Sequence, residues 1–108
     1  LSQVVSGELT YAVRDANLDG HTIKEGQILG IIDGKIAAVG DDVRSLLKET
    51  LDLMPVDDYE LVTLYYGEDV QQKEAQELLS WLEEEYPDID FELHDGTQAV
   101  YFYLISAE

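Results

Sequence analysis

The segment ELVTLYYGEDVQQKEAQELLSWLEEEYPDIDFEL, residues 60–93, decides the predicted fold of this chain. Its apolar start, Glu60–Tyr66, is typical of a strand. A helix then begins at Asp69, whose carboxylate can cap it, with Gln72 three residues later as in a capping box. Apolar residues recur at helical spacing, and the predicted buried stripe comprises Ala75, Leu78, Leu79, Leu82 and Tyr86. A second strand, Ile89–Leu93, follows, so the segment predicts two parallel strands joined by a right-handed helical crossover.

The residues before this unit predict strands and one further helix. Gly7–Asp15 alternates as a strand should, with Leu9, Tyr11 and Val13 on one side. Gln27–Ile32 and Lys35–Val39 predict a hairpin around Asp33-Gly34, a pair that accepts the positive φ angles of a type I′ turn. A helix starts near Asp41-Asp42 and ends before Pro55, and its apolar positions are Val43, Leu46, Leu47, Thr50, Leu51 and Met54. Two short stretches, 17–20 and 24–26, are assigned to turns.

The last strand, Val100–Ser106, completes the set. Because a short polar connection separates it from Ile89–Leu93, we expect these two strands to pair antiparallel. The element order is then β-β-β-α-β-α-β-β. The sequence therefore predicts an α/β fold, a two-layer sandwich with a mixed sheet and two helices on one face.

Length and composition limit the class of protein. The chain has 108 residues and 45% hydrophobic content, which suits a single domain spanning 1–108 with a packed core. It has no cysteine, which excludes disulfides and thiolate sites, and no run near the roughly 20 apolar residues of a membrane span. No signal-peptide pattern opens it, so we expect a cytoplasmic protein. It starts at Leu1 and its one methionine is Met54, so we expect a fragment of a longer protein.

Charge is distributed unevenly along the chain. Residues 1–48 carry seven acids and five bases, a net of −2, whereas residues 49–108 carry seventeen acids and one base, Lys73, a net of −16. Such a field repels nucleic acid and anionic membranes, because phosphate binding depends on Lys and Arg. Two interpretations of the acidity stay open, which are general solubility and steering of a basic protein partner.

Polar residues after the strands are the candidate functional groups. In open α/β sheets, ligands and partners meet the fold just past the carboxyl ends of strands. The candidates are Arg14, Asp15, Tyr66, Glu68, Asp69, His94, Asp95, Gln98, Tyr101 and Tyr103. His94 and Asp95 are adjacent, so in a strand they point to opposite faces and form no acid–base pair unless the loop bends. A hard-cation site would need both acidic loops at one sheet edge, and no recognised metal-loop spacing is present, so we predict no metal, cofactor or catalytic residue. The tyrosines suit either a core or an interface.

Several stretches in order resemble a known family. They are Gly7–Asp15 (GELTYAVRD), residues 23–36, Tyr66–Val70 (YGEDV), His94–Gln98 (HDGTQ) and Tyr101–Ile105 (YFYLI). Together they resemble the C-terminal domain of the ATP-binding subunit of bacterial fatty acid kinase. That protein is dihydroxyacetone-kinase-like, and its C-terminal region is also called phosphatase-like. The resemblance implies a DegV-like fold and a missing N-terminal kinase domain that binds ATP and magnesium. It also implies docking of a DegV-like fatty-acid-binding protein, whose acyl carboxylate is phosphorylated by that kinase domain.

Three functional hypotheses follow from the sequence. The leading one is a non-catalytic docking domain that uses the ten candidate residues to bind its protein partner. The second is a domain that binds a small ligand, a fatty acid or a nucleotide, between the Tyr66–Asp69 and His94–Gln98 loops. The third is a phosphatase-like hydrolase, which the lack of a nucleophile with its base disfavours. The oligomeric state of the parent protein, a homodimer included, stays open.

Overall fold

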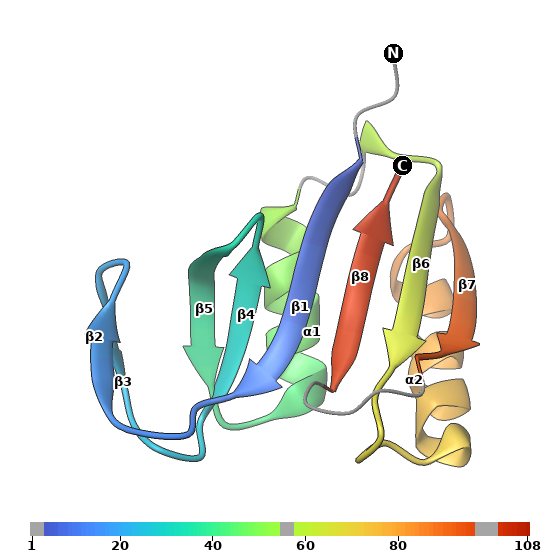
Figure 1. The fold of residues 1–108 in the computed structure, drawn as a ribbon. Helices are drawn as coiled ribbons and strands as arrows, with labels where there is room; N and C mark the ends of the chain where they lie inside the picture. Colours follow the sequence, from blue (N-terminus) through green and yellow to red (C-terminus); the bar gives the residue numbers. More distant parts are fainter. Residues whose placement is uncertain (1–3, 55–57, 97–101) are drawn as a thin grey trace.

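A computed structural model describes residues 4–54, 58–96 and 102–108 of the chain. In this described part, six strands form one mixed sheet in the order β5-β4-β1-β8-β6-β7, and two helices cover one of its faces (Figure 1). The sheet strands are β1 (Val5–Tyr11), β4 (Ile28–Ile32), β5 (Lys35–Gly40), β6 (Leu61–Tyr66), β7 (Asp90–Asp95) and β8 (Tyr103–Ala107). The helices are α1 (Val43–Leu53) and α2 (Gln72–Glu85). The predicted two-layer α/β sandwich is confirmed.

The strand–helix–strand unit folds as predicted, but the last strand does not. β6 and β7 are parallel neighbours joined by α2. β8 pairs antiparallel with β1 and β6, so the expected pairing with β7 is wrong. Side-chain character explains the difference, because β8 (YLISA) is mostly apolar and gains ladder hydrogen bonds on both edges in a central position. β7 (DFELHD) carries charged side chains, which protect the exposed edge of a sheet.

Two tight turns have the same backbone geometry. Asp33 and Gly34 join β4 to β5 with φ of 49° and 85°, which confirms the predicted hairpin. Asp19 and Gly20 have φ of 51° and 81°, and they join two short strands that the sequence did not predict, β2 (Ala16–Leu18) and β3 (His21–Ile23). This β2–β3 hairpin projects beyond β5 at one end of the sheet (Figure 1).

β1 is shorter than predicted because the chain leaves the sheet to form the β2–β3 hairpin. Leu9 is completely buried, as expected. Val13 lies beyond the strand and is 68% exposed, so its predicted place on the buried side is wrong. The departure of the chain at Ala12 is fixed by two backbone hydrogen bonds of 2.8 Å, from Ala12 N to Gln27 O and from Gly26 N to Ala12 O.

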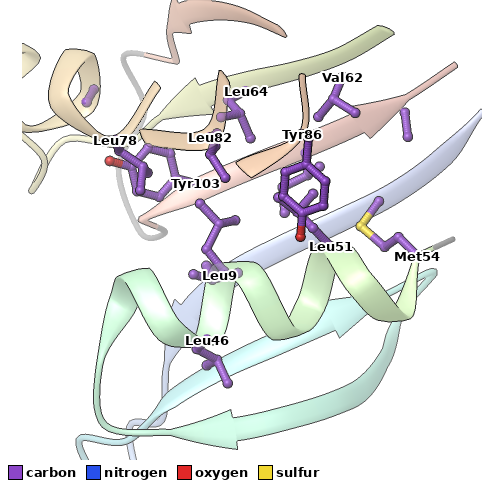
Figure 2. Close-up of a cluster of buried hydrophobic side chains, with 14 of the residues drawn as sticks. Leu9, Leu46, Leu51, Met54, Val62, Leu64, Leu78, Leu82, Tyr86 and Tyr103 are labelled. Carbon is purple, nitrogen blue, oxygen red and sulfur yellow. The ribbon is translucent and has the colours of Figure 1, made fainter. Parts of the chain in front are cut away.

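The hydrophobic core lies between the helices and the sheet (Figure 2). α1 packs on β1, β4 and β5, and α2 packs on β7. Residues from both regions have no exposed surface and belong to one cluster, including Leu9, Leu47, Leu51, Val62, Leu64 and Leu82. α1 approaches β4 so closely at Gly30 that a Cβ atom there would overlap the Thr50 hydroxyl. Only glycine therefore fits at that position without rearrangement.

The two helices start in different ways. Asp42 caps α1 by accepting a hydrogen bond from Ser45 N at 2.8 Å, and this bond holds the pKa of the Asp42 carboxyl below its ordinary value. α2 starts at Gln72 rather than Asp69, so the predicted Asp69 cap is wrong. A turn closed by Val70 N and Gly67 O at 3.1 Å leaves Asp69 outside the helix and exposed. Of the predicted stripe of α2, Leu79 is half-buried and the other four residues are buried.

Neither helix of the described residues is long and apolar enough to span a bilayer.

Candidate functional site

The loops that carry most of the candidate residues lie at one end of the sheet. β1, β6 and β7 run in the same direction, so their carboxyl ends meet there (Figure 1). Three backbone hydrogen bonds tie these ends together, from Gly96 N to Tyr66 O (2.9 Å), from Gly67 N to Phe102 O (2.9 Å) and from Phe102 N to Leu9 O (2.7 Å). We call residues 66–69 and 94–96 the loop rim.

The loop rim exposes acidic side chains. Glu68 and Asp69 are exposed in the turn after β6, and Asp95 is exposed at the end of β7. Tyr66 is half-buried and packs against the core, so it supports the rim from below. In the described stretches, no group of three or more His, Cys, Asp or Glu side chains is placed to hold a metal ion.

His94 lies on the sheet face opposite the helices. Its ring stacks on Tyr65 of the neighbouring strand, with centroids 5.6 Å apart and planes inclined by 28°. Its Nε2 lies 3.2 Å from Oε1 of Glu92, two residues earlier on the same face. The imidazole is 52% exposed. The carboxylate beside His94 is thus Glu92, and the cluster forms an exposed polar and aromatic surface next to the rim.

Tyr103 lies in the core and not on a contact surface. Its side chain is 3% exposed, and Figure 2 shows it beside Leu78 of α2. Burial, together with the nearby negative charge of Glu74, raises the pKa of Tyr103 to about 12. Its partner-binding assignment therefore conflicts with its position. Gln98 and Tyr101, the other two candidates on this strand and loop, lie outside the described residues.

Arg14 and Asp15 lie where the chain passes from β1 into β2. Asp15 Oδ1 accepts a hydrogen bond from Glu25 N at 2.8 Å, so this carboxylate braces the base of the β2–β3 hairpin. Arg14 is exposed, and within residues 4–54, 58–96 and 102–108 no ion pair joins it to Asp15. Asp15 therefore has a structural role, and Arg14 presents its charge to the solvent.

An apolar pocket adjoins Arg14, and sequence reasoning missed it. Its volume is about 450 Å³, and we call it the hairpin pocket. It is lined by Tyr11, Ala12, Val13, Arg14, Ala16, Leu18, Ile23 and Leu29. The edge of the Tyr11 ring contacts Phe102 at 5.9 Å between centroids, which links the hairpin pocket to the start of β8 beside the loop rim. The available signal was Val13 and Leu18, two apolar residues in a polar, turn-rich stretch.

The bases of the helical layer are engaged in contacts between α1 and α2. The Arg44 guanidinium lies 5.1 Å from the centre of the Trp81 ring, and Lys48 lies 4.9 Å from the centre of the Tyr86 ring. Lys48 also pairs with Asp52 at 3.6 Å and Glu85 at 3.8 Å, and the Tyr86 hydroxyl donates to Asp52 at 2.5 Å. These bases help to hold the helices together, in contrast to Arg14.

Comparisons with known proteins place the chain in a family. The family model for the C-terminal region of fatty acid kinase "A-like" subunits matches residues 1–108. The chain is 43% identical to Protein YloV of Bacillus subtilis (strain 168) and 40% identical to an uncharacterized protein of Staphylococcus aureus (strain MRSA252), each over 108 residues. Each alignment covers 100% of this chain and 20% of the relative, so the chain spans about a fifth of the length of these proteins. This chain belongs to the family of C-terminal domains of fatty acid kinase "A-like" subunits.

Proposed function

We propose that this domain binds a DegV-like fatty-acid-binding protein and brings it to a kinase domain elsewhere in the parent protein. That kinase domain, which lies outside this chain, would use ATP and magnesium to phosphorylate the acyl carboxylate. The domain itself supplies recognition and no bond-making step. We place the reaction in the cytoplasm, where it serves lipid metabolism.

Family membership over all 108 residues is the observation that carries this proposal. The family's description names a C-terminal position within a fatty acid kinase protein. The length of the relatives fits this division of labour, because the matched region is 20% of each protein and leaves ample chain for a separate catalytic domain.

The surface of the domain also favours recognition of a protein. The loop rim presents Glu68, Asp69 and Asp95 to the solvent on rigid strand ends. The seventeen acids of residues 49–108 create a negative field that attracts a partner with a basic surface. A rigid scaffold that displays exposed loops is the usual arrangement for a binding site.

Binding by the full-length protein and by a truncated form tests the proposal. The full-length protein that carries this chain is titrated with the DegV-like fatty-acid-binding protein of the same organism in an isothermal titration calorimeter. We expect saturable binding with a dissociation constant of about micromolar or tighter. Removal of the region corresponding to residues 1–108 should abolish binding, while nucleotide binding by the remaining protein serves as the folding control. Equal binding by the truncated protein would contradict the proposal.

A further inference from the structure

We propose that the hairpin pocket and Arg14 form the main contact surface of this domain, which receives an apolar side chain of the protein partner next to a partner carboxylate. This inference rests on the proposed function and specifies which surface performs it. It places the strongest contact on the near-neutral part of the molecule and not on the acidic loop rim.

Exposed apolar side chains concentrate at this pocket. Five large apolar side chains are exposed in the described part of the chain, and three of them line the hairpin pocket. They are Tyr11 at 37%, Val13 at 68% and Leu18 at 54% exposure. Large apolar groups that gather on one exposed surface mark an interaction site, whereas scattered ones need no explanation.

Arg14 adds a charge that the domain itself does not use. Arg44 and Lys48 make ring contacts, and Lys48 makes ion pairs, but over the described ranges Arg14 has neither kind of contact. A guanidinium beside exposed apolar groups favours a bidentate contact with a carboxylate. Tyrosine and arginine are also the residue types that dominate binding energy at protein interfaces.

The β2–β3 hairpin holds this surface in place before a partner arrives. Asp15 Oδ1 accepts from Glu25 N at the base of the hairpin, and Asp19 Oδ2 accepts from Ile36 N near its tip, both at 2.8 Å. The apolar contacts of Ala12, Ile23 and Leu29 fix the hairpin against the sheet. Such preorganisation lowers the entropy lost on binding.

The exposure of the pocket walls favours a protein partner over a free fatty acid. A small-ligand site generally encloses about 70–90% of its ligand. Here Val13 and Leu18 are more than half exposed, so they project from the surface and do not enclose a cavity. Projecting apolar groups around a shallow hollow fit a complementary surface, which a protein provides. Charge is compatible as well, since residues 1–48 carry a net of only −2 and repel a partner carboxylate less than residues 49–108 would.

Three substitutions in the full-length protein test this surface by calorimetric titration with the DegV-like partner. We expect Val13→Asp and Leu18→Asp each to weaken binding by at least about tenfold, and Arg14→Ala by about fivefold. The matched controls are Leu53→Asp, since Leu53 is 52% exposed on α1, and Lys73→Ala on α2, and both should stay within about twofold of wild type. Circular dichroism melts check folding. If an aspartate variant is unstable, Val13→Ser and Leu18→Ser replace it, with a smaller expected loss.

The outcomes separate this inference from the proposed function. Absence of binding by the wild-type protein would sink both. Wild-type binding that the three substitutions leave unchanged would overturn the hairpin surface alone. A melting temperature that sodium palmitate raises in wild type but not in Leu18→Asp would assign the pocket to a fatty acid and overturn the inference too.

Discussion

The two parts of this sheet share one core but present opposite surfaces. The part formed by β1, β4, β5 and α1 is nearly neutral and carries the β2–β3 hairpin with its exposed apolar groups. The part formed by β6, α2 and β7 contains most of the acids of residues 49–108 and carries the loop rim. Apolar contact area mainly governs how long a complex lasts, whereas net charge mainly governs how fast it forms. The difference therefore suggests that one part holds a partner and the other attracts it.

The acidic part keeps charges that do not help its own stability. Glu83, Glu84 and Glu85 occupy the last turn of α2, where the helix dipole disfavours anions. Lys48 of α1 reaches Glu85 at 3.8 Å, and the last turn of α2 itself contains no base. Selection for helix stability alone would place bases there, so the acids are consistent with a role in attraction.

Cavities made under each part should show whether the two parts fold as one unit. Leu47→Ala under α1 and Leu82→Ala under α2 each remove a side chain with no exposed surface. We expect each to lower the free energy of unfolding by about 2–5 kcal/mol, because the lost burial and the cavity add together. Since one core cluster spans both parts, urea unfolding should remain a single transition. Two separate transitions would show that the parts are independent.

A smaller loss of stability should follow overpacking at the contact between α1 and β4. In Gly30→Ala the new methyl group would overlap the Thr50 hydroxyl, and we expect a loss of about 1–3 kcal/mol in urea unfolding. The double variant Gly30→Ala/Thr50→Ala removes the hydroxyl and should recover part of that loss. An unchanged stability in Gly30→Ala would contradict the close approach of α1 to the sheet.

Local signals were sufficient to predict most of the fold. Asp33-Gly34 predicted its hairpin, Asp42 its helix start, and the segment 60–93 its parallel unit, because each depends on neighbouring residues. The position of β8 could not be predicted from connection length, because pairing is decided by which neighbours bury an apolar strand. β2 and β3 have three residues each, too few for a periodic pattern.

The candidate site was less predictable than the fold. The parallel pairing of β6 and β7 brings the two predicted loops together at Tyr66 and Gly96. Tyr103 has the same sequence signal as an interface tyrosine, and only its position between β1 and β6 reveals that it is buried. The hairpin pocket needed the structure, because Val13 and Leu18 meet through a chain reversal that alternation does not describe.

Alkaline titration should reveal the buried Tyr103 of the core. Its pKa is raised to about 12, so the folded state favours the neutral phenol and its stabilising effect is complete below the ordinary value of 10.0. That contribution is lost as the pH rises from about 10 to about 12. The melting temperature of wild type should therefore fall in this window more steeply than that of Tyr103→Phe. Parallel curves for the two proteins would contradict burial of the phenol.

The smallest effect should come from the exposed cap of α1. Asp42→Asn keeps the shape of the cap but removes the charge whose pKa is lowered by the hydrogen bond from Ser45 N. A lowered pKa stabilises the fold above the ordinary value of 3.8, and this benefit disappears as the pH falls through the folded value. Wild type should melt slightly higher than Asp42→Asn at pH 7, and the difference should vanish near pH 3. A difference that is independent of pH would rule out the charge as its cause.

The division between holding and attracting is tested most directly by rate constants for the DegV-like partner, measured by surface plasmon resonance at several salt concentrations. The account predicts that Leu18→Ser accelerates dissociation at least about threefold with little change in association. It predicts that Glu83→Gln/Glu84→Gln slows association at low salt and weakens its dependence on salt, with dissociation unchanged. Faster dissociation in the glutamate variant, together with wild-type rate constants in Leu18→Ser, would contradict the account.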